Sequence, residues 1–575
     1  MSNKTRKKDL IHLAFVLGLI VVLNIVSGQW FFRVDLTAEK RYTLADITRD
    51  FLADIDDDIM VKVYLEGDLN VGFQKLSRST RELLDEFEVA TSGDLHYHFV
   101  SPDNDAEGIE ELKEYGAEAV PVFESSADGR QIQSHVYPYA IVRMGDYEIV
   151  VNLLEHLQGR SGAENLHISQ ESLEYKFVDA IGRLISDEVK AIAFLEGHGE
   201  LDELDVYSAS ETLSHYYQVD RGSLTDDPYI LDNYEALIIA KPQERFSEKD
   251  KFIIDQYIMR GGRVFWLVDA VNVTLDSLRQ STETVGMAPD INLADQLFRY
   301  GVRINPDLVQ DMQAAQIPIN VSPAGQQPRF VPVPWMFNPL LHPGQSHAIT
   351  RNINLVRSEF ISSLDTVGNL SYVDREVILQ TGRRSRIHQV PVYISLALVN
   401  EEPQPEEFNL SHIPVAVAME GRFPSAFANR SIPPGVNMSE DEVLSKSEHT
   451  RMVVVSDGDI IRNEVRRRHT GSPQPQPLGF DEMSNHTFGN EQFVLNAVNY
   501  LADEKGWLSL RNRSYQLRML DREELSSNLT FWQWFNMLLP LIALFIGGVI
   551  VIAIRKTKHG KKSVYSFENL QRKNL

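Results

Sequence analysis

The chain of 575 residues contains no cysteine. Disulfide bonds, thiolate zinc sites, CxxC redox chemistry, a cysteine nucleophile and a lipoprotein anchor are therefore excluded. The sequence also lacks a G-x-x-x-x-G-K-[ST] phosphate loop, a G-x-S-x-G nucleophile elbow and an HExxH metal motif. We therefore expect a protein that is not an enzyme, has no catalytic residues, and holds neither a metal nor another cofactor. Any ATP-driven step would need a separate subunit.

The overall composition is that of a globular protein. Apolar residues make up 43% and charged residues 24%, so disorder, collagen and coiled coil are poor fits. At roughly 150 residues per domain, the length predicts several domains. The formal net charge of -25 argues against nucleic acid as a partner.

Long uncharged runs occur near both ends of the chain. Residues 10–28 and 531–554 contain no Lys, Arg, Asp or Glu. At 1.5 Å per residue the second run is about 36 Å long, more than the roughly 30 Å core of a bilayer. Trp30 and Trp532 lie at the inner ends, where an interfacial aromatic belt is expected. The sequence thus predicts two transmembrane helices, at 10–29 and 531–554.

Basic tails lie outside these two runs. Residues 1–9 and 555–575 together hold eleven Lys or Arg side chains and two acidic ones. The positive-inside rule then places both termini in the cytoplasm and the acidic remainder on the other side of the membrane. A cleaved signal peptide is the alternative for the first run, since the small residues at 26–28 would suit a cleavage site. No A-x-A site follows the run, which favours an uncleaved anchor.

Small residues in the second run suggest a helix-packing surface. Ala543, Gly547 and Gly548 would allow the backbone of a partner helix to approach closely. The alternative is that Gly and Ala are simply common in membrane helices.

Residues 35–185 form the first predicted domain, in which strand and helix patterns alternate. The order β-α-β-α-β-β, with Pro121 entering the third strand, resembles the thioredoxin fold, in which Pro121 would be the cis-proline. Without cysteine this domain is expected to serve only as a scaffold. The predicted elements cover residues 59–65, 73–90, 95–100, 109–115, 120–122, 139–144 and 147–153.

Residues 186–505 form the second predicted domain. Short apolar runs typical of buried parallel strands are separated by helical patterns, which predicts a doubly wound, Rossmann-like α/β sheet. The Pro-rich interval at about 305–450 interrupts this pattern and is interpreted as a large insertion or subdomain, with strand-like runs at 377–380 and 415–419. A juxtamembrane segment, 506–530, follows. The predicted parallel strands are 190–195, 236–240, 264–268 and 452–455, and the helices are 201–215, 247–260 and 489–502.

Polar side chains follow several of these strands. Because ligands of open α/β sheets bind beyond the carboxyl ends of the strands, these side chains form a candidate site for a small ligand or a hard cation. The alternative is that the acidic residues cap helices and the glycines among them make tight turns. The candidate residues are Glu196, His198, Glu200, Asp269, Asp457, Asp459 and Asn463.

The sequence resembles the auxiliary component of the ABC transporter associated with bacterial gliding motility, the GldG type. The resemblance covers nearly the whole chain, in the same order. Two stretches of the second domain, GRVFWLVD and VVVSDGD, also resemble the glutamine-amidotransferase-like superfamily, although the cysteine nucleophile of amidotransfer is missing. The stretches that carry the main resemblance are 34–44, 61–76, 194–201, 255–269, 293–311, 452–463 and 488–506.

The resemblance implies a permease and a cytoplasmic ATPase as partners, in the inner membrane of a Bacteroidetes-type bacterium. The leading hypothesis is a membrane-anchored periplasmic subunit that acts by complex formation or substrate presentation in motility or export. Two alternatives are a periplasmic receptor that binds a ligand at the sheet edge, and a hydrolase that uses Asp and His.

Overall fold

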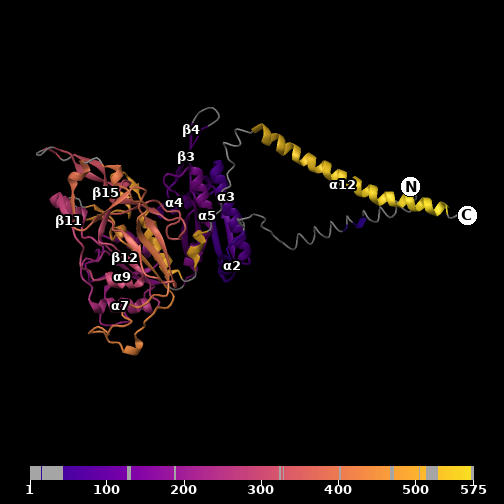
Figure 1. Ribbon diagram of the computed structural model, residues 1–575. Coiled ribbons are helices and arrows are strands. Elements are labelled where there is room, and N and C mark those ends of the chain that lie inside the picture. Colours follow the sequence, from indigo (N-terminus) through magenta and orange to yellow (C-terminus); the bar gives the residue numbers. More distant parts are fainter. Residues whose placement is uncertain are drawn as a thin grey trace. The chain divides into compact units, whose positions relative to one another are not determined.

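The computed structural model describes most of the chain, and Figure 1 shows its elements. The expected first membrane helix, 10–29, lies outside the described residues except for 14, 15 and 18. The chain divides into two units, Met1–Ser514 and Tyr515–Leu575. The described ranges are 14–15, 18, 43–125, 131–186, 189–322, 326–327, 329–400, 403–466, 472–503, 506–512 and 529–571.

The predicted first domain, 35–185, is built on a four-stranded sheet in the order β2-β1-β5-β6. Strand β1 is parallel to β2 and antiparallel to β5, and β5 and β6 form the expected hairpin. In β1, Ile59, Val61 and Val63 are fully buried whereas Met60 is 40% exposed, which is the alternation of a strand with one buried face. The elements are α2 (Asp46–Ala53), β1 (Ile59–Val63), α3 (Val71–Ala90), β2 (Leu95–Phe99), α4 (Ala106–Glu114), β5 (Tyr139–Met144), β6 (Tyr147–Asn152) and α5 (Gly162–Ile185).

The prediction for Pro121 is wrong. Strand β3 (Val120–Ser125), which contains Pro121, pairs with β4 (Gln131–Val136) in a separate hairpin and is not part of the four-stranded sheet. Within the described part of the chain the cis peptide bond is Val390–Pro391. The run around Pro121 has strand propensity, but pairing depends on the partner strand, which the sequence does not specify.

The predicted second domain, 186–505, contains a ten-stranded sheet whose main path is β14-β15-β18-β21-β22-β10-β9-β7-β8, with β16 paired to β15. Strands β8, β7, β9, β10 and β22 are mutually parallel, which confirms the prediction for β7, β9, β10 and β22. Strand β8 was missed because its sequence, QVDRGS, is polar and half-exposed at the sheet edge. The elements of this part are β7 (Ala191–Glu196), α6 (Tyr207–Ser214), β8 (Gln218–Ser223), β9 (Ala236–Ala240), α7 (Glu248–Met259), β10 (Val264–Leu267), β22 (Thr450–Val455) and α10 (Asn490–Ala502).

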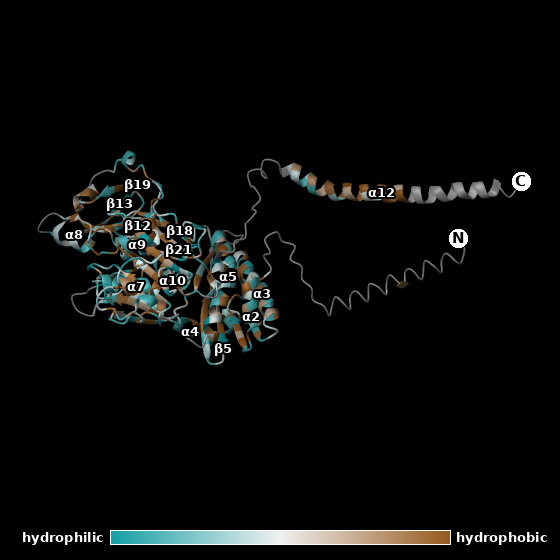
Figure 2. Cartoon of the chain, turned by 60° about the horizontal axis from the view of Figure 1, so that its bottom comes forward, coloured by the Kyte–Doolittle hydropathy of each residue, from teal (hydrophilic) through white to brown (hydrophobic). Residues whose placement is uncertain are grey.

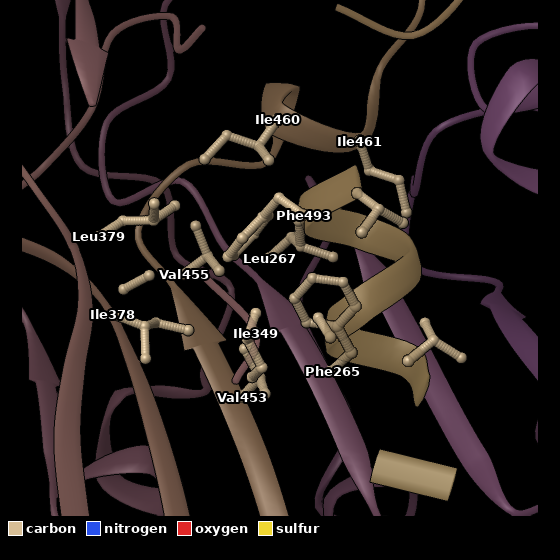
Figure 3. Close-up of a cluster of buried hydrophobic side chains, with 14 of the residues drawn as sticks. Phe265, Leu267, Ile349, Ile378, Leu379, Val453, Val455, Ile460, Ile461 and Phe493 are labelled. Atoms are coloured by element: carbon tan, nitrogen blue, oxygen red, sulfur yellow. The ribbon is translucent and has the colours of Figure 1, made fainter. Parts of the chain in front are cut away.

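Helices cover both faces of the parallel strands. Phe265 and Leu267 of β10 belong to the apolar cluster that contains α6 and α10, whereas Trp266 between them belongs to the cluster that contains α7. Figure 3 shows Phe493 of α10 beside Phe265 and Leu267. Successive side chains of a strand point to opposite faces, so these buried strands need apolar residues at every position. The sheet is therefore doubly wound.

The interval 305–450 is more than an insertion. Strand β21 pairs antiparallel with β22, and β18 pairs with β21, so the interval extends the central sheet. Trp335 and Phe337 of β15 anchor a further apolar cluster. The elements around this interval are α8 (Leu275–Ser281), β11 (Glu283–Gly286), α9 (Ala294–Tyr300), β12 (Val302–Ile304), β13 (Asp307–Asp311), β14 (Ala314–Asn320), β15 (Phe330–Pro343), β16 (Val356–Arg357), β17 (Leu364–Thr366), β18 (Val373–Gln380), β19 (Ser385–Gln389), β20 (Val392–Ser395) and β21 (Pro414–Gly421).

The segment after α10 packs back onto the first domain. In the short helix η6 (Trp507–Asn512), the Trp507 ring lies 4.7 Å from that of Phe51, and Leu510 belongs to the first-domain core. Gly182 of α5 makes room for Trp507, because an added Cβ there would meet the indole ring at 2.2 Å. Residues expected to be a juxtamembrane linker are thus partly structural.

The second unit contains α12 (Leu529–Gln571). Its stretch Thr530–Ile554 is the one described helix that is long and apolar enough to cross a membrane, and none of its most apolar window is buried. Figure 2 shows this stretch as a run of hydrophobic residues. It coincides with the predicted span at 531–554.

Candidate functional site

The parallel strands lie in the order β8-β7-β9-β10-β22. Strand β8 is added on one side of β7, and β9 and the later strands are added on the other side, so the strand order changes direction between β7 and β9. Ligands of open α/β sheets commonly bind at such a reversal. Here the loops that follow the two strands bind each other, since the His198 carbonyl accepts hydrogen bonds from the Gln243 and Glu244 backbone N–H groups at 2.9 and 2.7 Å. Gly197 and Gly199 have positive φ angles, as the tight turn after β7 requires.

His198 fills the space between these loops with its own side chain. Its ring stacks on Phe246 with centroids 3.7 Å apart, Nδ1 lies 3.2 Å from Glu200 Oε1, and Nε2 lies 3.3 Å from Asp250 Oδ2. Burial lowers the pKa of His198, but the hydrogen bonds that its ring donates to Asp250 and Glu200 outweigh this effect and raise the pKa to about 9. His198 is thus a buried cation that joins two loops.

Glu196 is apart from this cluster. It forms a 2.8 Å ion pair with Arg221 of the neighbouring strand β8 and is half-exposed. It therefore does not converge with the other predicted residues.

A buried charged cluster lies at the ends of β9, β10 and β22. The Lys241 ammonium, which follows β9, is 3.1 Å from Asp269 Oδ2 and forms a short hydrogen bond with Asp459. Asp457 is fully buried; its carboxylate accepts hydrogen bonds from the backbone N–H groups of Asp459 at 2.7 Å and Glu359 at 3.0 Å. The sheet edge thus brings together three of the predicted residues, Asp269, Asp457 and Asp459.

The cluster supplies its own cation. Carboxylate oxygens of Asp269, Asp457 and Asp459 lie within 4.8 Å of one another, a spacing suited to a metal ion, but Lys241 contacts two of the three. Burial lowers the pKa of Lys241, yet the charges of Asp269 and Asp459 outweigh it, so the pKa is raised and the amine stays protonated. Burial also raises the pKa of Asp457 well above its usual range.

The local backbone positions Lys241 for its contacts with Asp269 and Asp459. Lys241 has a φ of +56°, a conformation that side-chain-bearing residues adopt only when their surroundings hold it. A Cβ on Gly458 would meet Lys241 Cβ at 2.4 Å, so the absent side chain at 458 makes room for the lysine. The Gly458 N–H donates to Asp269 Oδ1 at 2.5 Å.

Asn463, in the loop that follows β22, is hydrogen-bonded to the start of α6. Its Oδ1 accepts a hydrogen bond from the Ser208 N–H at 3.0 Å, and its Nδ2 donates to the Leu204 carbonyl at 2.9 Å. These contacts are those of a helix-terminus cap, the structural alternative for this residue.

A cavity of about 560 Å³ opens above the charged cluster. Asp459 and Asn463 line it, together with residues that sequence reasoning missed, among them Arg357, Glu359 and Arg462. Arg462 lies 3.3 Å from Asp459 Oδ1. Lys241 was visible in the sequence as a residue at a strand end, whereas Arg357 and Glu359 come from the interval at 305–450 and carry no sequence signal.

Comparison with known sequences identifies the class of protein. The chain belongs to the family described as an ABC-type uncharacterized transport system, which matches residues 189–497, more than half of the chain. Residues 38–143 match a domain of unknown function (DUF7088). Membership indicates an accessory role in ABC-type transport, in association with transporter components.

Other comparisons add little. The chain matches no curated protein. Among solved structures it is similar to one titled "mmIFT52 N-terminal domain", with 13% identity over 48% of this chain and 88% of that chain, and a TM-score of 0.27. A likeness at that level supports no inference.

Proposed function

We propose that this chain is a non-enzymatic, membrane-anchored subunit of an ABC transporter complex in a bacterial inner membrane. Its α/β domains would lie in the periplasm, and its partners would be the permease and the cytoplasmic ATPase. The observation that carries the proposal is that the family match at 189–497 and the apolar stretch Thr530–Ile554 occur in one chain. An apolar helix that stays in the membrane suits a fixed subunit better than a diffusing carrier.

The proposal also includes a role in gliding motility or export, a thioredoxin-like first domain and an amidotransferase-like second domain. The stretches of sequence that resemble the GldG type support the role in gliding motility or export. The order β2-β1-β5-β6, with β1 parallel to β2 and antiparallel to β5, supports a thioredoxin-like scaffold. The parallel order of the second sheet supports an amidotransferase-like, Rossmann-like domain without its nucleophile.

A two-pass topology gives the first test. We expect alkaline phosphatase, which is active only outside the cytoplasm, to be active when fused after Arg33 and inactive when fused after Lys562. The reason is the placement of basic tails outside both apolar runs. Fusion protein abundance, measured by immunoblot, is the control. Activity of the Lys562 fusion would contradict the two-anchor topology.

The second candidate is a periplasmic receptor, favoured by the cavity at the carboxyl ends of the strands. Asp459, which is ion-paired with Lys241, lines this cavity together with other charged side chains. A subunit could serve both roles by presenting its ligand to the permease. The hydrolase alternative has less support, because the His198 ring nitrogens face Glu200 and Asp250 instead of a nucleophile.

A further inference from the structure

A second cavity, of about 750 Å³, lies where α5, the turn after α6 and the segment after α10 meet. Its lining shares no residue with the cavity above the charged cluster. Helix α5 contributes Tyr175, Asp179 and Arg183 to the lining, each four residues after the one before, so their side chains form one stripe of the helix. Asp179 lies in the middle of this stripe and therefore faces the cavity.

Asp179 has an unpaired carboxylate. Within the described part of the chain this carboxylate has neither a hydrogen-bond donor nor an ion-pair partner. The side chain is half-buried, and its oxygens are not sealed inside the protein, so a molecule in the cavity can reach them. Burial raises the pKa of the Asp179 carboxyl to about 6, although the charges of Arg183 and Arg511 lower it. The ionised carboxylate thus lacks the close counter-charge that acids inside proteins normally have.

The charged groups near Asp179 are engaged elsewhere. The Arg183 guanidinium donates a hydrogen bond to the His215 carbonyl at 3.0 Å and lies 4.1 Å from the centre of the Tyr216 ring. The other two carboxylates of the lining are satisfied. Glu148 accepts a hydrogen bond at 2.8 Å from an arginine of β5, and Asp503 accepts two backbone N–H groups at 3.0 and 2.9 Å. Among the residues that line this cavity, Asp179 is therefore the acid that a ligand could neutralise.

Aromatic side chains make up much of the lining. The face of an aromatic ring carries partial negative charge and attracts cations, which is why such rings recur in sites for ammonium groups. Apolar side chains, among them Ile149, Leu184 and Leu508, complete the wall and suit an apolar body. The aromatic residues are Phe51, Tyr147, Tyr175, Tyr216, Tyr217 and Trp507.

We propose that this cavity binds a small organic amine, whose ammonium group pairs with Asp179 among the aromatic rings and whose apolar body lies against the apolar wall. The ammonium group would supply the counter-charge that Asp179 lacks. The volume of about 750 Å³ lies within the range of roughly 300–1,000 Å³ found for small-molecule sites. The inference goes beyond the proposed subunit and receptor functions and depends on neither.

The test is calorimetry with the purified full chain in detergent and three probes of similar size. The probe 2-phenylethylamine is positively charged at neutral pH, 2-phenylethanol is neutral, and 3-phenylpropanoate is negatively charged. We expect the amine to bind at least about tenfold more tightly than the alcohol, because only the amine makes a charge-assisted hydrogen bond with the carboxylate. The anion should bind more weakly than either.

One variant locates the site. Asp179→Asn keeps the size of the side chain and removes its charge, so it should weaken binding of the amine by about tenfold or more and leave binding of the alcohol unchanged. Because the carboxylate has no partner to lose, the melting temperature of this variant should not fall. Asp226→Asn is the matched control, since Asp226 is an exposed carboxylate paired with Lys249 and does not line the cavity. All three chains are measured in the same detergent, so partition of the probes into micelles is the same for each.

Equal binding of the amine and the alcohol, tighter binding of the anion, or no binding of the amine at millimolar concentration would overturn the proposal. Undiminished binding of the amine by the Asp179→Asn variant would overturn it as well. Co-purification with transporter subunits does not depend on this cavity. A failure here is therefore distinguishable from a failure of the subunit function.

Discussion

Replacing Lys241 with methionine is expected to lower the free energy of unfolding by about 3–5 kcal/mol. Methionine keeps the apolar stem of the lysine but removes the ammonium group that lies between Asp269 and Asp459. Both carboxylates are buried; Asp269 would lose this cation, and Asp459 would keep only Arg462. Urea denaturation of the purified chain, followed by circular dichroism, measures the loss.

The loss should shrink in acid. Without the lysine, burial raises the pKa of the carboxyl groups in the cluster, so they protonate as the pH falls and no longer require a counter-ion. Lys251→Met is the matched control. Lys251 is also fully buried, but its partners Asp295 and Glu248 are about half exposed and remain hydrated, so a loss of about 1 kcal/mol or less is expected. Equal losses in both variants would contradict the account of the cluster.

His198 is expected to make stability depend on pH. Its pKa in the folded chain is about 9 against an ordinary 6.5, so its contribution is fully present below about pH 6.5 and is lost as the pH rises through 9. The shift corresponds to a contribution on the order of 3 kcal/mol. Replacing His198 with glutamine should therefore destabilise the chain at pH 6 much more than at pH 9, as measured by the urea midpoint at each pH.

His388→Gln is the control with the opposite sign. Burial and the charge of Arg386 lower the pKa of His388, so this histidine costs stability once the pH falls below its ordinary pKa of 6.5. Its replacement should help at low pH and have little effect at pH 9. If the His198→Gln variant lost the same stability at both pH values, the ion pairs with Glu200 and Asp250 would contribute little.

Buried strands were predictable where every residue was apolar. The run ALIIA at 236–240 is β9, with all five residues buried. The predicted helix 247–260 is α7, which ends just before Gly261 and Gly262. Strand β8 and the pairing of β18 with β21 were not predictable, because an edge strand tolerates polar residues and pairing joins segments far apart in the sequence. The pairing of β3, which contains Pro121, with β4 was not predictable for the same reason.

The candidate site was predictable in part for a topological reason. Parallel strands end at one edge, so Asp269, Asp457 and Asp459 were expected to converge, and they do. Glu196 does not join them, because its strand neighbour Arg221 binds it instead. Lys241 was visible at the end of a strand, but its role as the counter-charge was not predictable, since a lysine after a strand is ordinary on a protein surface.

The central claim is that the chain is a fixed subunit of an ABC transporter complex. The most direct measurement is affinity purification of the full chain from detergent-solubilised membranes, with mass spectrometry of what accompanies it. We predict that a permease and an ATPase co-purify in fixed proportion. Replacing Gly547 and Gly548 with leucine should loosen the complex without unfolding the domains, whereas Val551→Leu, as control, should not. A full chain that purifies alone, or a chain cut free of its membrane helices that restores function in cells lacking the protein, would contradict the account.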